Sequence, residues 1–269
     1  MRRPSRARGL AFESVGEGPP LVILHGLFGS GGNWRSVARE LSGSHRVLCV
    51  DLRNHGASPW ADSMTYLQMA DDVLRLIERE GLSRPRVLGH SMGGKVAMTL
   101  ALLYPQHVGS LTVVDIAPVA YADRLSVVAE AMRTIDTLGA ASREEVRQRL
   151  AELLPDAGVV PFLMQNLVAR NAHFDWRVNL RAILASIKSL SGFPAELRGL
   201  RFTRPVHLIA GGQSDYVTQA DGEAFWPMFD RVHVEVIEPA GHWVHADQPE
   251  AFIAAVRRAL QPAPVAVTD

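Results

Sequence analysis

The chain has 269 residues, 47% of them hydrophobic, and its 28 basic side chains balance 28 acidic ones. This composition fits one or two globular domains, and the zero net charge argues against a nucleic-acid partner or an acidic solvating tail. No apolar run is long enough to cross a membrane, and no apolar segment follows the basic N-terminus. We therefore expect a cytoplasmic protein without a secretory signal or a membrane partner.

The first half of the chain alternates short apolar runs with amphipathic segments. The runs at 21–25 and 46–50 contain almost no polar residue, which is typical of strands covered on both faces. We predict strands at 8–14, 21–25, 46–50, 86–88 and 111–114, and helices at 33–41, 65–80 and 95–104. Strands that alternate with helices predict an α/β protein with a mostly parallel sheet and right-handed crossovers.

The alternation stops after Pro118. Only helical patterns follow until Leu190, and we predict helices at 125–138, 142–153, 159–169 and 176–190. Strand patterns return at 206–210 and 232–237, and a last helix is predicted at 250–260. The sequence thus predicts a core built from residues 1–120 and 195–269, with an all-helical cap at 121–194 inserted into it.

Residues 89–93, Gly-His-Ser-Met-Gly, fit the G-x-S-x-G pattern of a nucleophile elbow. This motif needs a strand before it and a helix after it, and both are predicted here. The two glycines remove Cβ atoms that would clash in the sharp turn, whose backbone is strained at the serine. We therefore predict that Ser91 is a nucleophile.

A serine hydroxyl needs a neighbouring base to become a good nucleophile. Of the ten histidines, His242 follows the last predicted strand and precedes the last helix, so it should lie at the same edge of the sheet as Ser91. It also obeys the chain order serine, acid, histidine. His245 lies further toward the helix, and we interpret it as a structural or supporting residue.

Two aspartates compete for the role of the acid that orients His242. Asp115 ends the strand after the elbow unit, and Asp215 follows the next-to-last strand. Either carboxylate could orient the imidazole. Each also has a structural interpretation, Asp215 as a turn or helix-capping residue and Asp115 as an anchor at the start of the cap. Asp51 and Asp247 are weaker candidates.

An oxyanion hole is built from backbone N–H groups rather than from particular side chains. The elbow pattern supplies one from the residue after the nucleophile, Met92, and one from an earlier strand-to-helix loop. The loop beginning at His25 and Gly26 fits, and we predict the Leu27 N–H as the second donor, with Phe28 as the alternative. His25 itself is expected to brace this loop by hydrogen bonds.

Two further segments are expected to have structural roles. The polar loop 51–58, Asp-Leu-Arg-Asn-His-Gly-Ala-Ser, should form hydrogen bonds that stiffen the site, since no metal-ligand spacing emerges in it. Cys49, the only cysteine, lies within an apolar strand pattern and is expected to pack in the core.

With these motifs in this order, the chain resembles the α/β-hydrolase superfamily. The segments that carry the closer resemblance, to the YbfF-type carboxylesterases, are residues 25–30, 51–56, 89–95, 114–119 and 241–246. The resemblance implies an α/β-hydrolase fold and a cofactor-free hydrolase with a helical cap that acts on short acyl esters or thioesters. The YbfF-type group favours Asp115 as the acid, whereas the wider superfamily more often uses the position of Asp215. Serine at position 91 argues against the dehalogenases and epoxide hydrolases of the superfamily.

The resulting hypothesis is a serine carboxylesterase that hydrolyses short-chain esters of small molecules through an acyl-enzyme, without cofactor or metal. The alternatives are perhydrolase or haloperoxidase-like activity, thioesterase activity, and a non-catalytic ligand-binding protein. The substrate is expected between the sheet edge and the cap. The predicted lining residues are Phe28, Phe162, Trp176, Val217 and Trp243.

Overall fold

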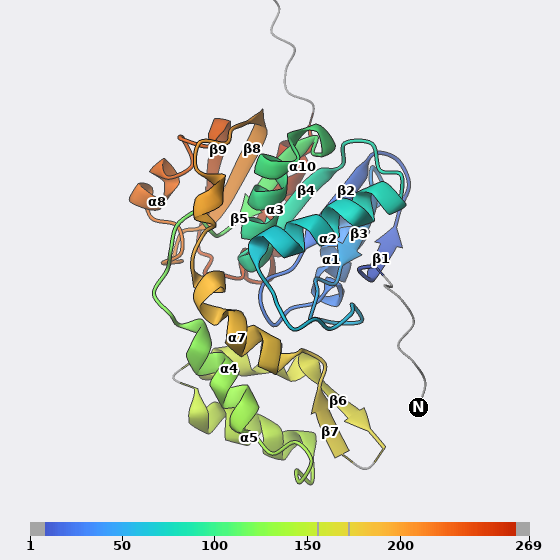
Figure 1. Ribbon diagram of the computed structural model, residues 1–269, viewed down its shortest axis with the longest axis vertical. Coiled ribbons are helices and arrows are strands. Elements are labelled where there is room, and N and C mark those ends of the chain that lie inside the picture. Colours follow the sequence, from blue (N-terminus) through green and yellow to red (C-terminus); the bar gives the residue numbers. More distant parts are fainter. Residues whose placement is uncertain (1–8, 155, 172, 262–269) are drawn as a thin grey trace, which may run out of the picture.

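The computed structural model describes residues 9–261 except 155 and 172, and it is shown in Figure 1. Residues 1–8 and 262–269, the two ends of the predicted core, lie outside the described residues. The first of these ranges contains the N-terminal segment from which we predicted the absence of a secretory signal, and it also contains residue 8 of the first predicted strand. Within the part that is described, no helix combines the length and the apolarity needed to span a bilayer.

A seven-stranded sheet with the order β1-β3-β2-β4-β5-β8-β9 forms the centre of the molecule. Every neighbouring pair is parallel except β1 with β3. The predicted α/β class with a mostly parallel sheet is confirmed. The strands are β1 (Phe12–Val15), β2 (Pro20–Leu24), β3 (Arg46–Val50), β4 (Arg86–His90), β5 (Ser110–Val114), β8 (Phe202–Gly211) and β9 (Phe229–Ile237).

Helices cover both faces of this sheet (Figure 1). Alternate side chains of β2 point to opposite faces: Val22 and Leu24 pack in the cluster that contains α2 and α3, whereas Leu21 and Ile23 pack with α1 and α10. This two-sided burial explains why the strand sequences are continuously apolar. The helices of these layers are α1 (Arg35–Leu41), α2 (Tyr66–Arg79), α3 (Met92–Leu103), α9 (Val244–Asp247) and α10 (Pro249–Ala259), and the short α8 (Gln219–Glu223) precedes β9.

The chain between β5 and β8 leaves the sheet and forms the group of elements below it in Figure 1. This segment contains α4 (Leu125–Thr134), α5 (Arg143–Leu153), α6 (Val160–Leu163), β6 (Leu167–Arg170), β7 (His173–Trp176) and α7 (Leu180–Ser191). The prediction of an all-helical insertion is therefore wrong at one place, because β6 and β7 pair as an antiparallel hairpin. The division of the chain into two domains at 121 and 194 stays a prediction.

The hairpin explains two errors in the predicted helices. The helix predicted at 159–169 ends early, and the one predicted at 176–190 begins four residues later, at Leu180. Asn171, at the turn, has a φ of 50°. Asparagine tolerates this left-handed backbone better than most residues, and between two runs with β-branched and aromatic side chains it is a turn signal. The hydrophobic spacing by itself did not indicate this turn.

Candidate active site

Ser91 occupies the sharp turn between β4 and α3, with φ 52° and ψ −120°. Such a backbone is unusual for a residue with a side chain, and the Ser91 N–H holds it by donating to the Val114 carbonyl over 3.0 Å. A Cβ at Gly93 would lie 2.4 Å from the Leu24 carbonyl oxygen, and one at Gly89 would lie 2.2 Å from the Gly93 carbonyl oxygen. Both glycines of the motif are thus sterically required for the turn.

Asp115 and His242 form a direct pair at the carboxyl edge of the sheet. Asp115 Oδ2 lies 2.7 Å from His242 Nδ1, and the carboxylate is fully buried. The Gly211 N–H donates to Oδ1 over 2.9 Å and the Ser214 hydroxyl donates to Oδ2 over 2.5 Å. These hydrogen bonds fix the direction in which the carboxylate faces the imidazole.

Asp215 lies apart from this pair. Its side chain is 61% exposed and forms an ion pair with Arg124, whose guanidinium holds the pKa of Asp215 below its usual value. The structure therefore brings Asp115, and not Asp215, into hydrogen-bond contact with His242. The two candidates that the sequence left open differ in burial as well as in contact.

His242 is held on several sides. The Tyr216 ring stacks on the imidazole, with centroids 4.0 Å apart and an interplanar angle of 22°. His90 Nε2 donates to the His242 carbonyl oxygen over 2.9 Å, which ties the histidine loop to the elbow. Burial keeps the pKa of His90 well below its ordinary value, so this imidazole is neutral and its single N–H is used in that bond. Tyr216 is a contact that the sequence analysis missed, although it directly follows Asp215.

His245 packs behind His242 rather than beside Ser91. Its ring stacks on Trp34 with centroids 4.3 Å apart, and its Nδ1 is buried without a hydrogen-bond partner among the described residues. Burial lowers the pKa of His245 to about 4, so the ring is neutral near pH 7. This environment agrees with the structural interpretation of His245.

The loop after β2 lines the large cavity together with Ser91, through Gly26, Leu27 and Phe28. Phe28 has a φ of 61°. Its N–H donates to His55 Nε2 over 3.2 Å, so this amide is already engaged. Within the described part of the chain, the amides of Leu27 and Met92 have no hydrogen-bond acceptor. The geometry therefore leaves Leu27 and Met92, rather than Phe28, as the amides available to a substrate oxygen.

Two buried histidines support this loop. His25 Nδ1 donates to the Gly26 carbonyl over 2.8 Å, and its Nε2 accepts the Leu52 N–H over 3.0 Å. Burial lowers the pKa of His25 to about 4 and that of His55 to about 3. Both rings are therefore neutral, which allows each to donate from one nitrogen and to accept at the other. The prediction that His25 braces the loop is confirmed.

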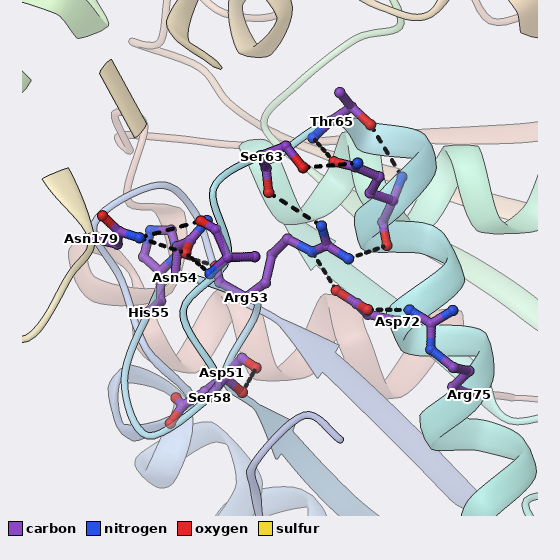
Figure 2. Close-up of polar contacts among 12 residues, drawn as sticks. Asp51, Arg53, Asn54, His55, Ser58, Ser63, Thr65, Asp72, Arg75 and Asn179 are labelled. Atoms are coloured by element: carbon purple, nitrogen blue, oxygen red, sulfur yellow. Dashed lines mark hydrogen bonds and ion pairs between the residues drawn. The ribbon is translucent and has the colours of Figure 1, made fainter. Parts of the chain in front are cut away.

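The loop 51–58 forms the hydrogen-bond network that Figure 2 shows. The Asp51 carboxylate accepts the Gly31 and Ala57 amides over 2.7 and 2.8 Å. The Asn54 side chain accepts from Asn179, the residue that caps α7, and the Asn179 amide donates to the Asn54 carbonyl. The loop is hydrogen-bonded as predicted, and it also connects the sheet edge to the inserted segment.

Arg53 extends this network toward α2 (Figure 2). Its guanidinium pairs with Asp72 over 2.5 Å and donates to the carbonyl oxygens of Ser63 and Gln68.

Cys49 is buried in β3, where burial raises the pKa of its thiol to about 12, in agreement with a packing role. No group of three His, Cys, Asp or Glu side chains among the described residues is arranged to hold a metal.

Ser91 lines two cavities of different size. The large cavity has a volume of about 540 Å³, within the range of ordinary ligand sites, and the small cavity has a volume of about 40 Å³. The side chains that line the large cavity include Phe28, Asp123, Arg124, Leu125, Val128, Leu154, Asp156, Val159, Phe162, Tyr216, His242 and Trp243. The residues that line only the small cavity are Tyr66, Met92, Lys95, Ile116, Tyr121, Ala122, Leu190 and Ser191. The two cavities adjoin and share Leu27, Ser91, Arg124, Leu125 and Tyr216.

Three of the five predicted lining residues, Phe28, Phe162 and Trp243, are at the large cavity. Val217 and Trp176 are not at either cavity. Trp176 belongs to β7 and is buried inside the inserted segment, where its Nε1 donates to the Met132 carbonyl over 3.0 Å. The apolar spacing around position 176 reflects packing within that segment rather than contact with a ligand.

Lys95, one turn after Ser91 on α3, is a buried cation that the sequence analysis did not assign. Its Nζ donates to the carbonyl oxygens of Val119, Ser191 and Gly192 over 2.7, 3.2 and 2.6 Å. Burial lowers the pKa of Lys95 to about 7, while three acceptors favour the ammonium form. Val119 precedes the inserted segment and the other two end it, so Lys95 connects both of its ends to the helix of the elbow.

Comparison with known proteins agrees with this fold. Residues 19–249 match the family described as alpha/beta hydrolase fold. The chain belongs to the α/β hydrolase family. This α/β hydrolase is 34% identical to Esterase YbfF of Escherichia coli K12, across 90% of this chain and 92% of the relative. It is 35% identical to the sn-1-specific diacylglycerol lipase ABHD11 of Danio rerio, across 93% of this chain and 81% of the relative.

The solved structure of a marine microorganism esterase superposes on this α/β hydrolase with a TM-score of 0.90. The two sequences are 34% identical, and the match covers 94% of this chain and all of the other. The predicted resemblance to YbfF-type esterases is confirmed. The protein is an α/β hydrolase of the esterase and lipase type, a carboxylic ester hydrolase.

Proposed function

We propose that this α/β hydrolase is a serine carboxylesterase that cleaves short-chain esters of small molecules through an acyl-enzyme. The observation that carries the proposal is the hydrogen bond between the buried Asp115 and His242, whose imidazole lines the same large cavity as Ser91 at the elbow. No hydrogen bond of the Ser91 hydroxyl is found among the described residues. Contacts of this kind are often long until the substrate is bound.

In the proposed reaction the Ser91 hydroxyl attacks the ester carbonyl and passes its proton to His242 Nε2. Asp115 accepts the Nδ1–H, which holds the tautomer that leaves Nε2 as the base and stabilises the imidazolium once it forms. The developing oxyanion accepts hydrogen bonds from the amides of Leu27 and Met92.

Collapse of the tetrahedral intermediate breaks the bond to the alcohol oxygen, which receives the proton from His242. Water then attacks the acyl-Ser91 ester while His242 acts as base again, and the acid is released. The stacking of Tyr216 and the hydrogen bond from His90 restrict the imidazole to an orientation in which it can serve both steps.

We also propose that residues 121–194 act as a cap that helps to select the substrate. Leu125, Val128, Leu154, Val159 and Phe162 come from this segment and line the large cavity. The names of the similar proteins, an esterase and a diacylglycerol lipase, support an ester as the substrate.

Labelling with a fluorophosphonate, followed by mass spectrometry, tests the nucleophile. One label is expected on Ser91, and Ser91→Ala should lose both the label and roughly 10⁶-fold in turnover of a p-nitrophenyl acetate substrate. Ser189→Ala, an exposed site on α7, is the matched control and should retain both. A folded Ser91→Ala protein with near wild-type turnover would disprove the proposal.

A further inference from the structure

The two cavities beside Ser91 differ more than tenfold in volume, about 540 against about 40 Å³. A water-sized probe occupies on the order of 10–15 Å³ by this measure, so the small cavity holds a chain of only a few atoms. An ester has one group on each side of its reacting carbonyl. The two groups of a bound ester must therefore be assigned to cavities of very different capacity.

The position of His242 decides the assignment. His242 lines the large cavity and is not among the residues of the small one. In the proposed mechanism His242 protonates the leaving oxygen, which must therefore lie on the His242 side of Ser91. The alcohol group then extends into the large cavity, and the acyl group is left for the small one, beside Met92 and Ile116.

The polar side chains of the small cavity are largely engaged, which disfavours a charged acyl chain. Arg124 lines this cavity as well as the large one, and its guanidinium is paired with Asp215. The three N–H groups of Lys95 are taken by the carbonyls of Val119, Ser191 and Gly192. The Tyr66 hydroxyl donates to the Leu190 carbonyl over 2.6 Å. What remains for contact with an acyl chain is largely apolar, including the side chains of Ile116 and Leu190.

The large cavity suits a long apolar group. The large cavity has many apolar lining residues, among them Val128, Leu154, Val159, Phe162 and Trp243. Of its acidic and basic residues, Asp123 and Arg124 precede α4 and Asp156 follows α5. We infer that the preferred substrates are esters of a short, uncharged acyl group with a long apolar alcohol. This inference rests on the proposed function and specifies its substrate class.

Two isomeric esters test the assignment directly. Octyl acetate and ethyl octanoate contain the same atoms and similar ester groups, but they carry the long chain on opposite sides of the carbonyl. Octyl acetate should have a kcat/KM at least about tenfold higher, since one surplus methylene in a closed apolar pocket already costs about 10-fold or more. Equal values, or a preference for ethyl octanoate, would overturn the inference.

The same measurements separate this inference from the proposed function. If neither isomer nor p-nitrophenyl acetate is hydrolysed and the fluorophosphonate leaves Ser91 unlabelled, the proposed function fails and the inference falls with it. If Ser91 is labelled and ethyl octanoate is the better substrate, the serine esterase stands and only the cavity assignment is wrong.

Two variants then locate the selectivity in the structure. Leu190→Ala enlarges the small cavity and should raise the rate on ethyl butyrate relative to ethyl acetate by about tenfold. Ile187→Ala removes the same number of side-chain carbons one turn earlier on α7, at a buried site that lines neither cavity, and should leave this ratio unchanged.

Val128→Trp narrows the large cavity and should lower the rate on octyl acetate relative to ethyl acetate by about tenfold or more, without changing the acyl ratio. The opposite pattern, in which Leu190→Ala changes only the alcohol ratio and Val128→Trp only the acyl ratio, would show that the two groups bind the other way round.

Discussion

Asp115 Oδ2 lies 2.7 Å from His242 Nδ1 in a fully buried position, while Asp215 is exposed and paired with Arg124. The two aspartates end or follow neighbouring strands, β5 and β8, so they are close in the topology and were both plausible from the sequence. Only one is directed at the imidazole. A substitution of Asp215 can therefore serve as the control for the same substitution of Asp115.

Asp115→Asn should lower kcat on a short ester by about 10⁴-fold, because the amide cannot hold the His242 tautomer or stabilise the imidazolium. Asp215→Asn removes a solvent-screened ion pair and should change kcat no more than a few-fold. Steady-state kinetics with folding checked by circular dichroism makes the comparison. A severe loss confined to Asp215→Asn would contradict the proposed role of Asp115.

Lys95→Met should destabilise the fold by roughly 2 kcal/mol or more, because the Val119 and Gly192 carbonyls lose this donor and each unsatisfied group costs about 1–3 kcal/mol. The Ser191 carbonyl keeps the Tyr121 N–H as a donor. Lys188, the only other lysine, is exposed on α7, and Lys188→Met should stay within about 0.5 kcal/mol of the wild type. Urea unfolding measures both variants. Equal midpoints for Lys95→Met and Lys188→Met would show that the carbonyl contacts contribute nothing to stability.

His245→Phe should make the protein less sensitive to acid. Burial lowers the pKa of His245 to about 4 from an ordinary value of 6.5, so unfolding takes up a proton between these values. The neutral ring's contribution to the free energy of unfolding is complete above pH 6.5 and is lost as the pH falls toward 4. At about 1.4 kcal/mol per pKa unit it amounts to as much as about 3 kcal/mol.

Phenylalanine keeps the stacking on Trp34 and replaces the buried, unpartnered Nδ1 of His245. Unfolding free energies measured from pH 7 to pH 4.5 should therefore fall less steeply in His245→Phe than in the wild type. Identical slopes for His245→Phe and the wild type would argue against a neutral, buried His245.

Phe162→Ala and Trp176→Ala should have different consequences, although both residues were predicted to line the pocket. Phe162 lines the large cavity and contacts the Trp243 ring at a centroid distance of 5.8 Å, so its loss should change KM and the alcohol preference. Trp176 is buried within the inserted segment, and its loss should cost about 3–5 kcal/mol of stability. Ester profiles and thermal melts distinguish the two. A changed ester profile with unchanged stability in Trp176→Ala would refute this assignment.

The local parts of the site were predictable because short-range sterics encode them. Gly89 and Gly93 mark a turn that only small residues permit, and the apolar runs on either side specify a strand and a helix. The position of His242 followed from chain order, since the ends of parallel strands meet at one edge of the sheet. Resemblance to a known family then added the expected chemistry.

By itself the sequence determined the α/β sheet, the elbow at Ser91 and the histidine loop, all of which depend on periodicity and turn chemistry within a few residues. The hairpin β6–β7, the choice of Asp115 over Asp215 and the unequal cavities depended on the tertiary structure. The last two arise where segments distant in the chain converge, as when Gly211 at the end of β8 and Ser214 in the loop after it orient Asp115. Such contacts depend on how whole elements pack, which local sequence patterns do not encode.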